Sequence, residues 1–588
     1  MAETAAQPQV IFKGVAKGLL KVAAIFAAIF VVYKLFGARL APADYRLFPV
    51  IGSRIFVWIF AELHLLFAAF VLGVPIFAVI AEVIGIATGD KRYDNLAHEF
   101  TRLLALAFTL TAIFGAVLLL GLLLLYPKFT HIMTGVFKPT YYLYLAAMFG
   151  EVVYAYTYYY SWDYLAAPRS SKWLHVFCGV MVNVFGTAIM FVADAWASFM
   201  MTPSGVSPTG QVIDLAAAAM NYTWMPINVH RLIGNVAFGG FIVGAYAAVR
   251  YLSSDNRKER EHYDWMGYVG NFIGICGMIP LPFAGYWLAK EVYAFNQTMG
   301  ISMMGGIFSW LFIVQAILIG MLFVGGNYYL WIAMQRIPGG ERYQASIKYL
   351  VAAVFACFAI WMTPHTVLMT AREQAAIGGA HHPLVGVFGV MSAKMTAVNI
   401  IILATFMSFM MYRSANKQLE GSGARAGKWI VAGIYVLAAA VVVYIGVKGY
   451  FVPSEVRVEK LSPMQVGVVL GAMFLVLSVT LVTERLAKAK SLGDIRWGEM
   501  PARSQYALIL MAVTITLLMG LMGYLRSALR QNYHVYGIVK ETGAEAFTPT
   551  LGYAGIVIAV TVLIFYLCVM GIFWLGMRGA KTGEEGAA

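Results

Sequence analysis

The sequence contains little charge and little cysteine. Asp, Glu, Lys and Arg make up 12% of its 588 residues, whereas soluble domains carry about a quarter, so an ordinary soluble domain is excluded. The four cysteines all lie in apolar segments and form no CxxC or CxxCH pattern. Disulfide frameworks, cysteine-ligated metal clusters and covalently attached haem therefore have no support. The N-terminal stretch MAETAAQPQ lacks the basic start of a signal peptide, so the first apolar run is interpreted as an ordinary span.

Long apolar runs dominate what is present, because 61% of the residues are hydrophobic. A helix needs roughly 20 apolar residues to cross a bilayer. We therefore expect an all-α polytopic membrane protein with about fourteen transmembrane helices in a lipid bilayer. The expected spans are 17–38, 52–87, 98–126, 138–167, 172–201, 220–252, 264–294, 305–336, 345–370, 385–413, 427–448, 464–484, 504–526 and 551–577.

The positive charge predicts how the chain is oriented. A net charge of +14 can indicate nucleic acid, but the Lys and Arg residues lie in short loops between apolar runs, so no nucleic-acid partner is expected. These loops follow the even-numbered spans, whereas the segments 202–222 and 295–305 contain no Lys or Arg. The positive-inside rule then predicts a multi-pass protein of a prokaryotic cytoplasmic (inner) membrane, with both termini in the cytoplasm.

Ionisable residues within the spans are the candidate functional residues, since lipid makes such groups costly. Glu62 and His64 lie two residues apart in the apolar run 54–82. The predicted topology places polar residues of four further spans in the same outer layer: Glu151, Asp194, His230 and His365. Histidine is a frequent axial ligand of haem iron, and a carboxylate can pair with it or carry protons. The layer therefore indicates haem.

Each of these residues also has a structural interpretation. A lone intramembrane histidine can be a hydrogen-bonded core residue, and His365, which follows Pro364, can face a loop. The glycines after His230 suit a flat cofactor or close helix packing. The aromatic run 154–165 suits a porphyrin, but an interfacial belt is favoured for that run alone. Lys394, at the outer end of its span, can snorkel to the membrane surface.

Five motifs in this order resemble subunit I of the cytochrome bd family of quinol oxidases. They are SRIFVWIFAELHLLFAAFVLG, AEVIGIATGDKRYDN, GEVVYAYTYYYSWDYL, NVFGTAIMFVADAWASFMMTPSG and PINVHRLIGNVAFGGFIVGAYAAV. The resemblance implies a nine-helix haem-binding core at 51–414. An extra transmembrane helix then lies in 1–50, and four additional helices lie in 415–588.

The resemblance also implies ligands. His64 matches an axial ligand in the high-spin haem region, and His230 matches the histidine that binds the low-spin haem b. His365 lies near the position of a glutamate that binds the second high-spin haem, so we predict His64, His230 and His365 as iron ligands. Arg54 matches an arginine at the start of the first core helix. Trp196 belongs to a polar-plus-Trp motif, and we expect both Arg54 and Trp196 to contact the cofactor.

Three carboxylates complete the expected site. Glu151 matches an acid associated with proton delivery, and Asp194 falls in the polar-plus-Trp motif. Together with Glu62, these residues are expected to move protons or to balance the haem charge. Electrons would enter at the outer face, and protons for any oxygen chemistry would come from the cytoplasm.

Several family features are missing. The methionine that serves as second ligand of the low-spin haem is replaced by Ala316, with Met321 a turn later, and Leu143 replaces an acid two turns before Glu151. The long hydrophilic loop used for quinol oxidation is reduced to FNQTMGISMMG. The four C-terminal spans show no cofactor-like residue, and docking of another subunit is their expected use.

The function predicted from the sequence is a haem-b-binding membrane subunit of a respiratory electron-transfer complex. One or more haem b groups are expected, and haem d stays open. Oxygen reduction near the outer face would make it a terminal oxidase subunit, with quinol or a c-type cytochrome as electron partner and other membrane subunits beside it. The alternatives are an electron relay that docks a c-type cytochrome without oxygen chemistry, a transporter, and a haem-free scaffold.

Overall fold

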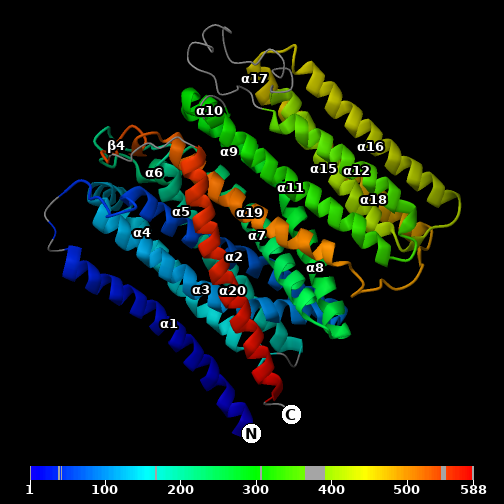
Figure 1. Ribbon diagram of the computed structural model, residues 1–588, viewed down its shortest axis with the longest axis horizontal. Helices are drawn as coiled ribbons and strands as arrows, with labels where there is room; N and C mark the ends of the chain where they lie inside the picture. The colour runs from blue at the N-terminus through cyan, green and yellow to red at the C-terminus, as the bar shows by residue number, and fades with distance from the viewer. Residues whose placement is uncertain are drawn as a thin grey trace. The chain divides into compact units, whose positions relative to one another are not determined.

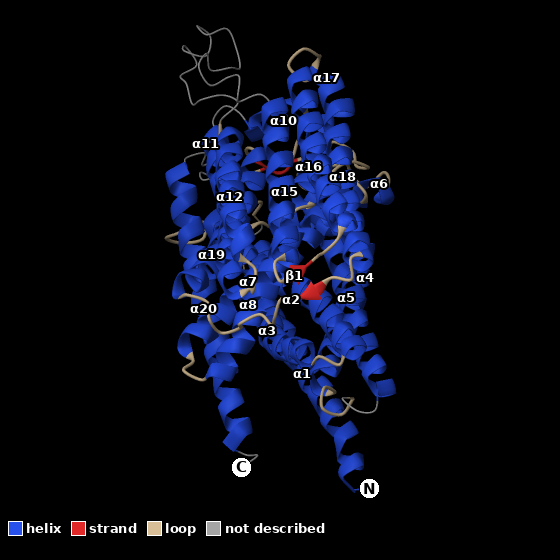
Figure 2. Ribbon diagram, turned by 90° about the vertical axis from the view of Figure 1, so that its right-hand side faces the viewer, coloured by secondary structure: helices blue, strands red, loops and turns tan. Residues whose placement is uncertain are grey.

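A computed structural model describes residues 2–37, 40, 43–165, 169–304, 308–363, 391–543 and 551–585. Helices account for nearly all of the described secondary structure, and the strands form only short two-stranded pairs (Figure 2). The predicted all-α class is confirmed. Within the described ranges, thirteen helices are long and apolar enough to cross a membrane. Thirteen of the fourteen expected spans each overlap one long helix, and the span 264–294 is divided between α8 (Arg257–Met278) and α9 (Leu281–Phe295). Helix α4 (Pro127–Tyr160) is not among the thirteen apolar helices, because its tyrosines and lysines lower its hydropathy.

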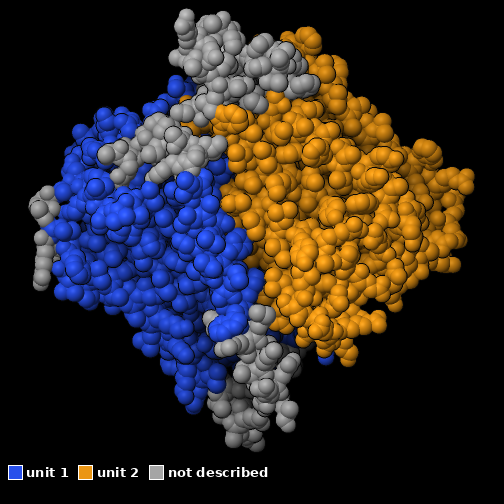
Figure 3. Space-filling model, viewed as in Figure 1, with its two compact units in different colours: residues 1–240, 284–300, 519–588 blue, residues 241–283, 301–518 orange. Residues whose placement is uncertain are grey.

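The chain forms two compact units, each assembled from separated stretches of sequence (Figure 3). Unit 1 contains residues 1–240, 284–300 and 519–588, and unit 2 contains residues 241–283 and 301–518. Both units therefore draw on segments before and after residue 414. The division into 1–50, 51–414 and 415–588 rests on the family resemblance and stays a prediction.

Long helices that run side by side make up unit 1 (Figure 1). Its helices are α1 (Ala2–Phe36), α2 (Ser53–Thr88), α3 (Lys91–Leu125), α4, α5 (Arg169–Phe199), α6 (Leu215–Ala219), most of α7 (Trp224–Ser253), most of α9 (Leu281–Phe295), the start of α10 (Gln297–Met304), the end of α19 (Ala502–Leu529) and α20 (Leu551–Glu585). Its strands are β3 (Tyr533–Val535) and β4 (Val539–Lys540), which pair antiparallel across a bulge.

Helix α2 is the enclosed centre of this unit, with Leu66 and Val74 fully buried. It ends at Gly89, whose positive φ of 73° closes the helix, and Asp90 then caps α3 by accepting a hydrogen bond from the Arg92 amide at 3.0 Å. This tight turn makes α2 and α3 antiparallel neighbours. At Gly73 the backbone of α2 touches the Asn235 carbonyl of α7, an approach that any side chain would prevent.

Unit 2 holds a second set of helices. They are α8 (Arg257–Met278), α11 (Ser309–Ala333), η3 (Met334–Arg336), α12 (Glu341–Met362), α15 (Met391–Ser414), α16 (Ser422–Lys448), α17 (Ser454–Val456), the π-helical η4 (Arg457–Leu461), α18 (Ser462–Leu486) and the first part of α19. Strands β1 (Lys417–Gln418) and β2 (Lys490–Ser491) form one antiparallel pair.

A buried ion pair fixes one end of unit 2. The Arg336 guanidinium donates to Asp264 and, over 3.1 Å, to the Tyr412 hydroxyl, and it stacks 4.2 Å from the Trp497 ring. The second Asp264 oxygen accepts from the Gly498 amide at 2.8 Å. Both charges are thus paired and hydrogen-bonded, as burial demands. These contacts tie the loop between α18 and α19 to α8 and η3.

Lys394 is buried near the start of α15, with 2% of its surface exposed, so it does not snorkel. Its ammonium lies 4.0 Å from the centre of the Phe312 ring and has no hydrogen-bond partner among the described residues. Because a desolvated donor without an acceptor is costly, we expect Lys394→Met to raise the free energy of unfolding by about 1–2 kcal/mol. Chemical unfolding in detergent measures this change in the free energy of unfolding. A loss of stability in Lys394→Met would show that the ammonium has a hydrogen-bond acceptor.

Candidate haem site

Four of the residues expected in the outer layer lie around Arg231, which follows His230 on α7. Its guanidinium donates to Asp194 of α5, whose side chain is fully buried. Arg231 also lies within electrostatic range of His230 and of Glu62 and His64 on α2. Three helices that are far apart in the sequence therefore bring these residues into one cluster. All of its members belong to unit 1.

The His64 ring has one nitrogen engaged and one available. Its Nδ1 lies 2.9 Å from the carbonyl oxygen of Thr111 on α3. Because a carbonyl only accepts, Nδ1 carries the proton of a neutral ring and Nε2 keeps its lone pair. Gly115 makes room for this orientation, since a Cβ there would lie 2.7 Å from the ring. A second partner that fixes the tautomer in this way is typical of a metal-binding histidine.

His230 packs against α9 and makes no hydrogen bond among the described residues. Its ring faces Gly285 of α9, where a Cβ would lie 3.5 Å from Cδ2 and 3.6 Å from Nε2. The ring is half-buried, although it lies deep inside the unit. Among the described residues no hydrogen bond engages it. Both ring nitrogens are therefore available to a ligand.

Glu62 points from α2 toward a glycine face of α19. A Cβ on Gly523 would lie 2.7 Å from Glu62 Oε2, and one on Gly520 would lie 3.8 Å from Oε1. The two glycines thus provide the space that the carboxylate occupies. The side chain itself is 4% exposed, and a buried carboxylate of this kind is a candidate for holding a proton.

Helix α19 also contributes a cation that the sequence analysis missed. The Arg526 guanidinium donates to the Ala197 carbonyl of α5 and lies within electrostatic range of Asp194 and Arg231. The expectation that the four C-terminal spans contain no site-forming residue is therefore wrong for α19. An arginine inside an apolar run is the signal that could have identified it.

Arg54 lies at the edge of the cluster. It is the second residue of α2 and is within electrostatic range of Arg530, which precedes the β3–β4 hairpin, and of His534 in β3. Arg530 donates to the His534 carbonyl at 2.6 Å and so closes the hairpin onto the end of α19. The His534 ring packs edge-on against Tyr126, 4.6 Å between centres.

A pH effect follows from the position of His534. Burial, followed by Arg530 and Arg54, lowers the pKa of His534 from 6.5 to about 3. Between these values the unfolded chain binds a proton that the folded chain does not, so stability falls as the pH falls, by up to about 1.4 kcal/mol per pH unit. We expect His534→Gln to remove this slope between about pH 6.5 and 5. The free energy of unfolding in detergent, determined at several pH values, measures this slope. His131→Gln, on the exposed face of α4, is the control and should leave the slope unchanged. Equal slopes in the wild type and His534→Gln would contradict the expectation.

Trp196 belongs to a neighbouring aromatic group on the α4–α5 interface. Its indole N–H donates to Thr140 at 2.8 Å, and its ring packs 4.7 Å from Tyr141 and 5.0 Å from Tyr144. The polar contact satisfies the indole nitrogen and fixes the ring. Trp196 follows Asp194 by two residues on the same helix and so remains close to the cluster.

Glu151 lies apart from the cluster around Arg231. A Cβ on Gly186 would lie 2.9 Å from Glu151 Oε1 and 2.8 Å from Leu72. Leu72 is two turns beyond His64 along α2, or roughly 12 Å. The reason is that α4 begins at Pro127 rather than near residue 138, so Glu151 lies further from the end of its helix. His365 lies outside the described residues.

Comparison with known proteins finds a family that part of the chain resembles. Residues 53–310 match the family described as cytochrome bd terminal oxidase subunit I. A candidate cytochrome bd menaquinol oxidase subunit I of Bacillus subtilis (strain 168) is 26% identical over 200 residues, which are 34% of this chain and 44% of the relative. The matched residues make up less than half of the chain, so it is this part that is similar to the cytochrome bd subunit I family. The matched residues include His64, Glu151, Asp194 and His230 but not α19.

A solved bd oxidase of Geobacillus thermodenitrificans is also similar. The two chains share 15% sequence identity, and the TM-score is 0.47 with 90% of this chain and 98% of the other covered. The alignment with the Bacillus subtilis relative spans less than half of that protein's length. What those proteins bind and do is therefore carried to this chain only as a proposal.

Members of the cytochrome bd family bind haem, and the side chains around Arg231 suit that group. The described ranges contain no cluster of three or more His, Cys, Asp or Glu residues that could hold a bare metal ion. Haem iron needs only one or two protein ligands, because the porphyrin supplies the other four. His64 and His230 each offer a free ring nitrogen, and Arg231 and Arg526 can balance the carboxylates of the haem. The chemistry of these residues fits haem.

Proposed function

We propose that this chain is a haem-b-binding integral membrane subunit of a respiratory electron-transfer complex, with His64 and His230 as iron ligands. The observation that carries the proposal is the hydrogen bond from His64 Nδ1 to the Thr111 carbonyl. It leaves the Nε2 lone pair in a cluster that also contains His230 and a balance of buried acids and arginines.

The residues around the ligands have distinct tasks. A bound haem would supply one-electron chemistry at its iron. Asp194 holds Arg231 in place, and Arg231 and Arg526 provide positive charge in a low-dielectric environment. Glu62, buried beside Gly523, can hold or release a proton as the charge of the site changes. Glu151, two turns deeper, can exchange protons with Glu62 through bound water.

Oxygen reduction is the first form that this function can take. The site would then be part of a terminal oxidase of a prokaryotic cytoplasmic membrane, working with other membrane subunits and with quinol as donor. The predicted topology places the ligands toward the outer face and both termini in the cytoplasm. Haem d in addition to haem b belongs to this form of the proposal.

Electron relay to or from a c-type cytochrome is the second form. A specific observation favours it. The connection between α9 and α11 is short and contains the helix α10 instead of a long hydrophilic loop. Without such a loop, a docked protein partner is an alternative route for electrons. His365, as a third ligand, and Arg54 and Trp196, as cofactor contacts, are part of the proposal in both forms.

The optical spectrum of the purified protein tests the proposal. A reduced-minus-oxidised difference spectrum with a b-type α-band is expected. No haem band in either state would reject both redox forms and leave a transporter or a haem-free scaffold.

Oxygen uptake then separates the two redox forms. Uptake with a quinol donor supports the quinol oxidase, and uptake only with a reduced c-type cytochrome supports an oxidase with a protein donor. A haem band without oxygen uptake from either donor supports the relay. Inactivated enzyme at the same protein concentration is the control for direct reaction of the donor with oxygen.

A further inference from the structure

Three lysines form a stripe on one face of α1. Lys13, Lys17 and Lys21 follow one another at intervals of four residues, which places them on the same face of a helix. All three are exposed, and among the described residues no acid forms an ion pair with them. Residues 4–43 contain no Asp or Glu. The lysine stripe therefore presents three positive charges that its own helix does not neutralise.

The lysine stripe runs down into the membrane rather than around its surface. Lys13 and Lys21 are eight residues apart, or roughly 12 Å along the helix axis. Lys21 lies well inside Gln9–Phe36, the apolar part of α1 that is long enough to cross a bilayer. A lysine at that depth is costly unless its ammonium reaches polar groups. Because helical side chains lean toward the N-terminus, the ammonium of Lys21 extends toward the head-group level of the leaflet that holds the N-terminal end of α1.

Two tyrosines of α4 border the lysine stripe. Helix α1 packs along α3 and α4 (Figure 1). Gly14 and Gly18 directly follow the first two lysines, and a Cβ on these glycines would collide with the rings of Tyr160 and Tyr156, respectively. The two rings stack with 6.2 Å between their centres. Tyrosines are enriched where head groups meet acyl chains, so these rings indicate the depth at which the lysines lie.

Exposed apolar side chains continue the stripe along α1. Ala24, Ala28 and Val31 follow Lys21 at intervals of three or four residues and share its face. All three are exposed, and Leu20 beside them is 69% exposed. Only 6% of the most apolar window of α1 is buried in the protein, compared with 67% for α2. A lipid with an anionic head group and apolar chains therefore matches this face, whereas a soluble anion matches only its charged part.

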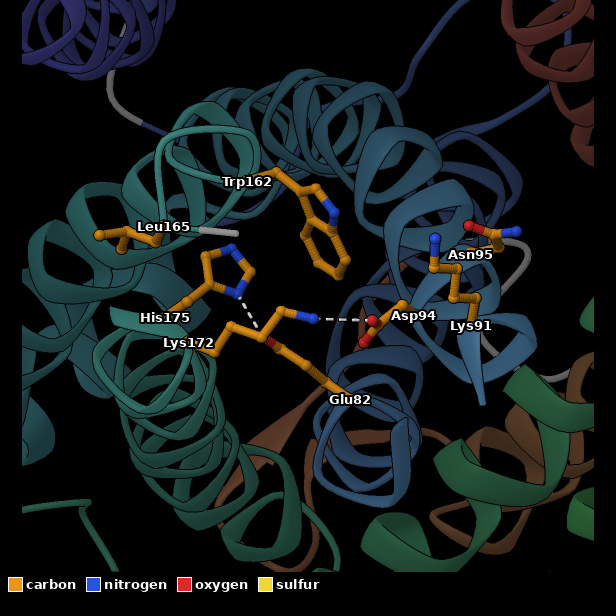
Figure 4. Close-up of a pocket in the computed structure, with 8 residues that line it drawn as sticks. All are labelled: Glu82, Lys91, Asp94, Asn95, Trp162, Leu165, Lys172 and His175. Carbon is orange, nitrogen blue, oxygen red and sulfur yellow. Dashed lines mark hydrogen bonds and ion pairs between the residues drawn. The ribbon is translucent and has the colours of Figure 1, made fainter. Parts of the chain in front are cut away.

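A polar cavity at the same end of α4 has charges that are paired within the protein (Figure 4). Its lining includes Lys172, which lies 2.8 Å from Asp94, and His175, which lies 2.7 Å from Glu82. Each of these two basic groups thus has an acid beside it in the cavity. The lysine stripe has no such acids among the described residues, so its charge is available to an external anion.

We propose that the lysine stripe binds an anionic phospholipid. The phosphate contacts the ammonium groups, and the acyl chains lie along Leu20, Ala24 and the exposed residues that follow them on the same face. The lipid fills the space beside the α1–α4 contact and holds a helix that buries little of its own surface. A lysine near an anionic lipid surface contributes about fivefold to binding, so three lysines are enough to select an anionic lipid over one without net charge. The site is independent of the proposed haem function.

The test measures lipid binding by the purified chain in detergent. Native mass spectrometry counts the bound molecules while phosphatidylglycerol, which is anionic, or phosphatidylcholine, which has no net charge, is titrated. The wild type is expected to bind one phosphatidylglycerol at least about tenfold more tightly than phosphatidylcholine. Lys13→Gln, Lys17→Gln and Lys21→Gln combined should abolish this preference, whereas the corresponding three changes to Arg should keep it. Equal binding of both lipids by the wild type overturns the proposal.

The matched control removes the same net charge elsewhere in the chain. Lys258, Lys348 and Lys428 are exposed residues of unit 2, on the side that the predicted topology assigns to the cytoplasm. Lys258→Gln, Lys348→Gln and Lys428→Gln combined should leave the preference for phosphatidylglycerol intact. An equal loss of preference in both triple variants overturns the site, because net charge alone would then explain the binding.

Two further measurements complete the test. Inorganic phosphate is titrated as a third ligand, and displacement of phosphatidylglycerol by an equal concentration of phosphate would overturn the assignment to a lipid. If the triple variant of the stripe does not purify, Lys21→Gln decides alone. It is expected to weaken binding of phosphatidylglycerol by about fivefold, and unchanged binding overturns the proposal.

Discussion

His64→Ala and His230→Ala are each expected to remove haem from the purified protein. Both side chains offer an imidazole nitrogen to the same cluster, and no other described side chain there replaces it. Outer partners of metal ligands already contribute about 10–100-fold to affinity, so loss of the ligand itself should weaken haem binding by more than about a hundredfold. The measurement is the haem absorbance per polypeptide after affinity purification in detergent.

His64 and His230 have different surroundings, so the haem spectra of the two alanine variants are interpreted separately. His64 is held by Thr111 of α3 at 2.9 Å, whereas His230 has no such partner among the described residues. Thr111 contributes a backbone carbonyl, so a side-chain change at Thr111 should leave the spectrum intact. His131→Ala, on the exposed face of α4, is the matched control for histidine loss. An unchanged spectrum in His230→Ala would contradict the assignment of His230 while leaving that of His64 in place.

Asp194→Ala is expected to destabilise unit 1 by about 3–5 kcal/mol, because it leaves buried arginine charge without its acid. Asp194 is fully buried and accepts from Arg231, and Arg526 lies within electrostatic range on α19. The desolvation cost of these two cations is then no longer offset. Unfolding by denaturant in detergent measures the loss, and Asp163→Ala, at an exposed position after α4, should change stability by less than about 0.5 kcal/mol.

A double-mutant cycle isolates the interaction energy between Asp194 and Arg231. Asp194→Ala combined with Arg231→Met removes both charges, and it should cost less than the sum of the single variants by about 1–3 kcal/mol. Additive losses would show that Asp194 and Arg231 do not stabilise one another. The same variants should shift the haem potential in opposite directions, since one removes a negative charge and the other a positive charge near the ligands.

Much of the fold could be predicted from the sequence because a bilayer imposes a simple rule on helix length. The expected spans of α2, α5 and α7 agree with the bounds of these helices to within a few residues. The same rule placed His64, His230 and Asp194 at a common depth, and the structure brings these three side chains together. Residue type and depth along a helix were enough for this part of the candidate site.

The contacts of the candidate site that the sequence did not predict depend on which helices are neighbours. The apolar periodicity of a helix does not contain that information. Arg526 joins Asp194 only because the end of α19 packs into unit 1, more than three hundred residues away in sequence. Glu82 and His175 are ninety-three residues apart and each looks like an isolated polar residue at a helix end. Glu151 lies further from the start of α4 than the expected span places it, because α4 begins before the apolar part of its sequence does.

A pyridine haemochrome assay of the purified protein tests the central claim most directly, since it identifies and counts haem independently of any electron donor. The account predicts at least one b-type haem for each polypeptide, reduced by about half or more in His64→Ala and in His230→Ala and unchanged in His131→Ala. A protein that folds and purifies without haem, or that keeps its full haem content in both ligand variants, would contradict it.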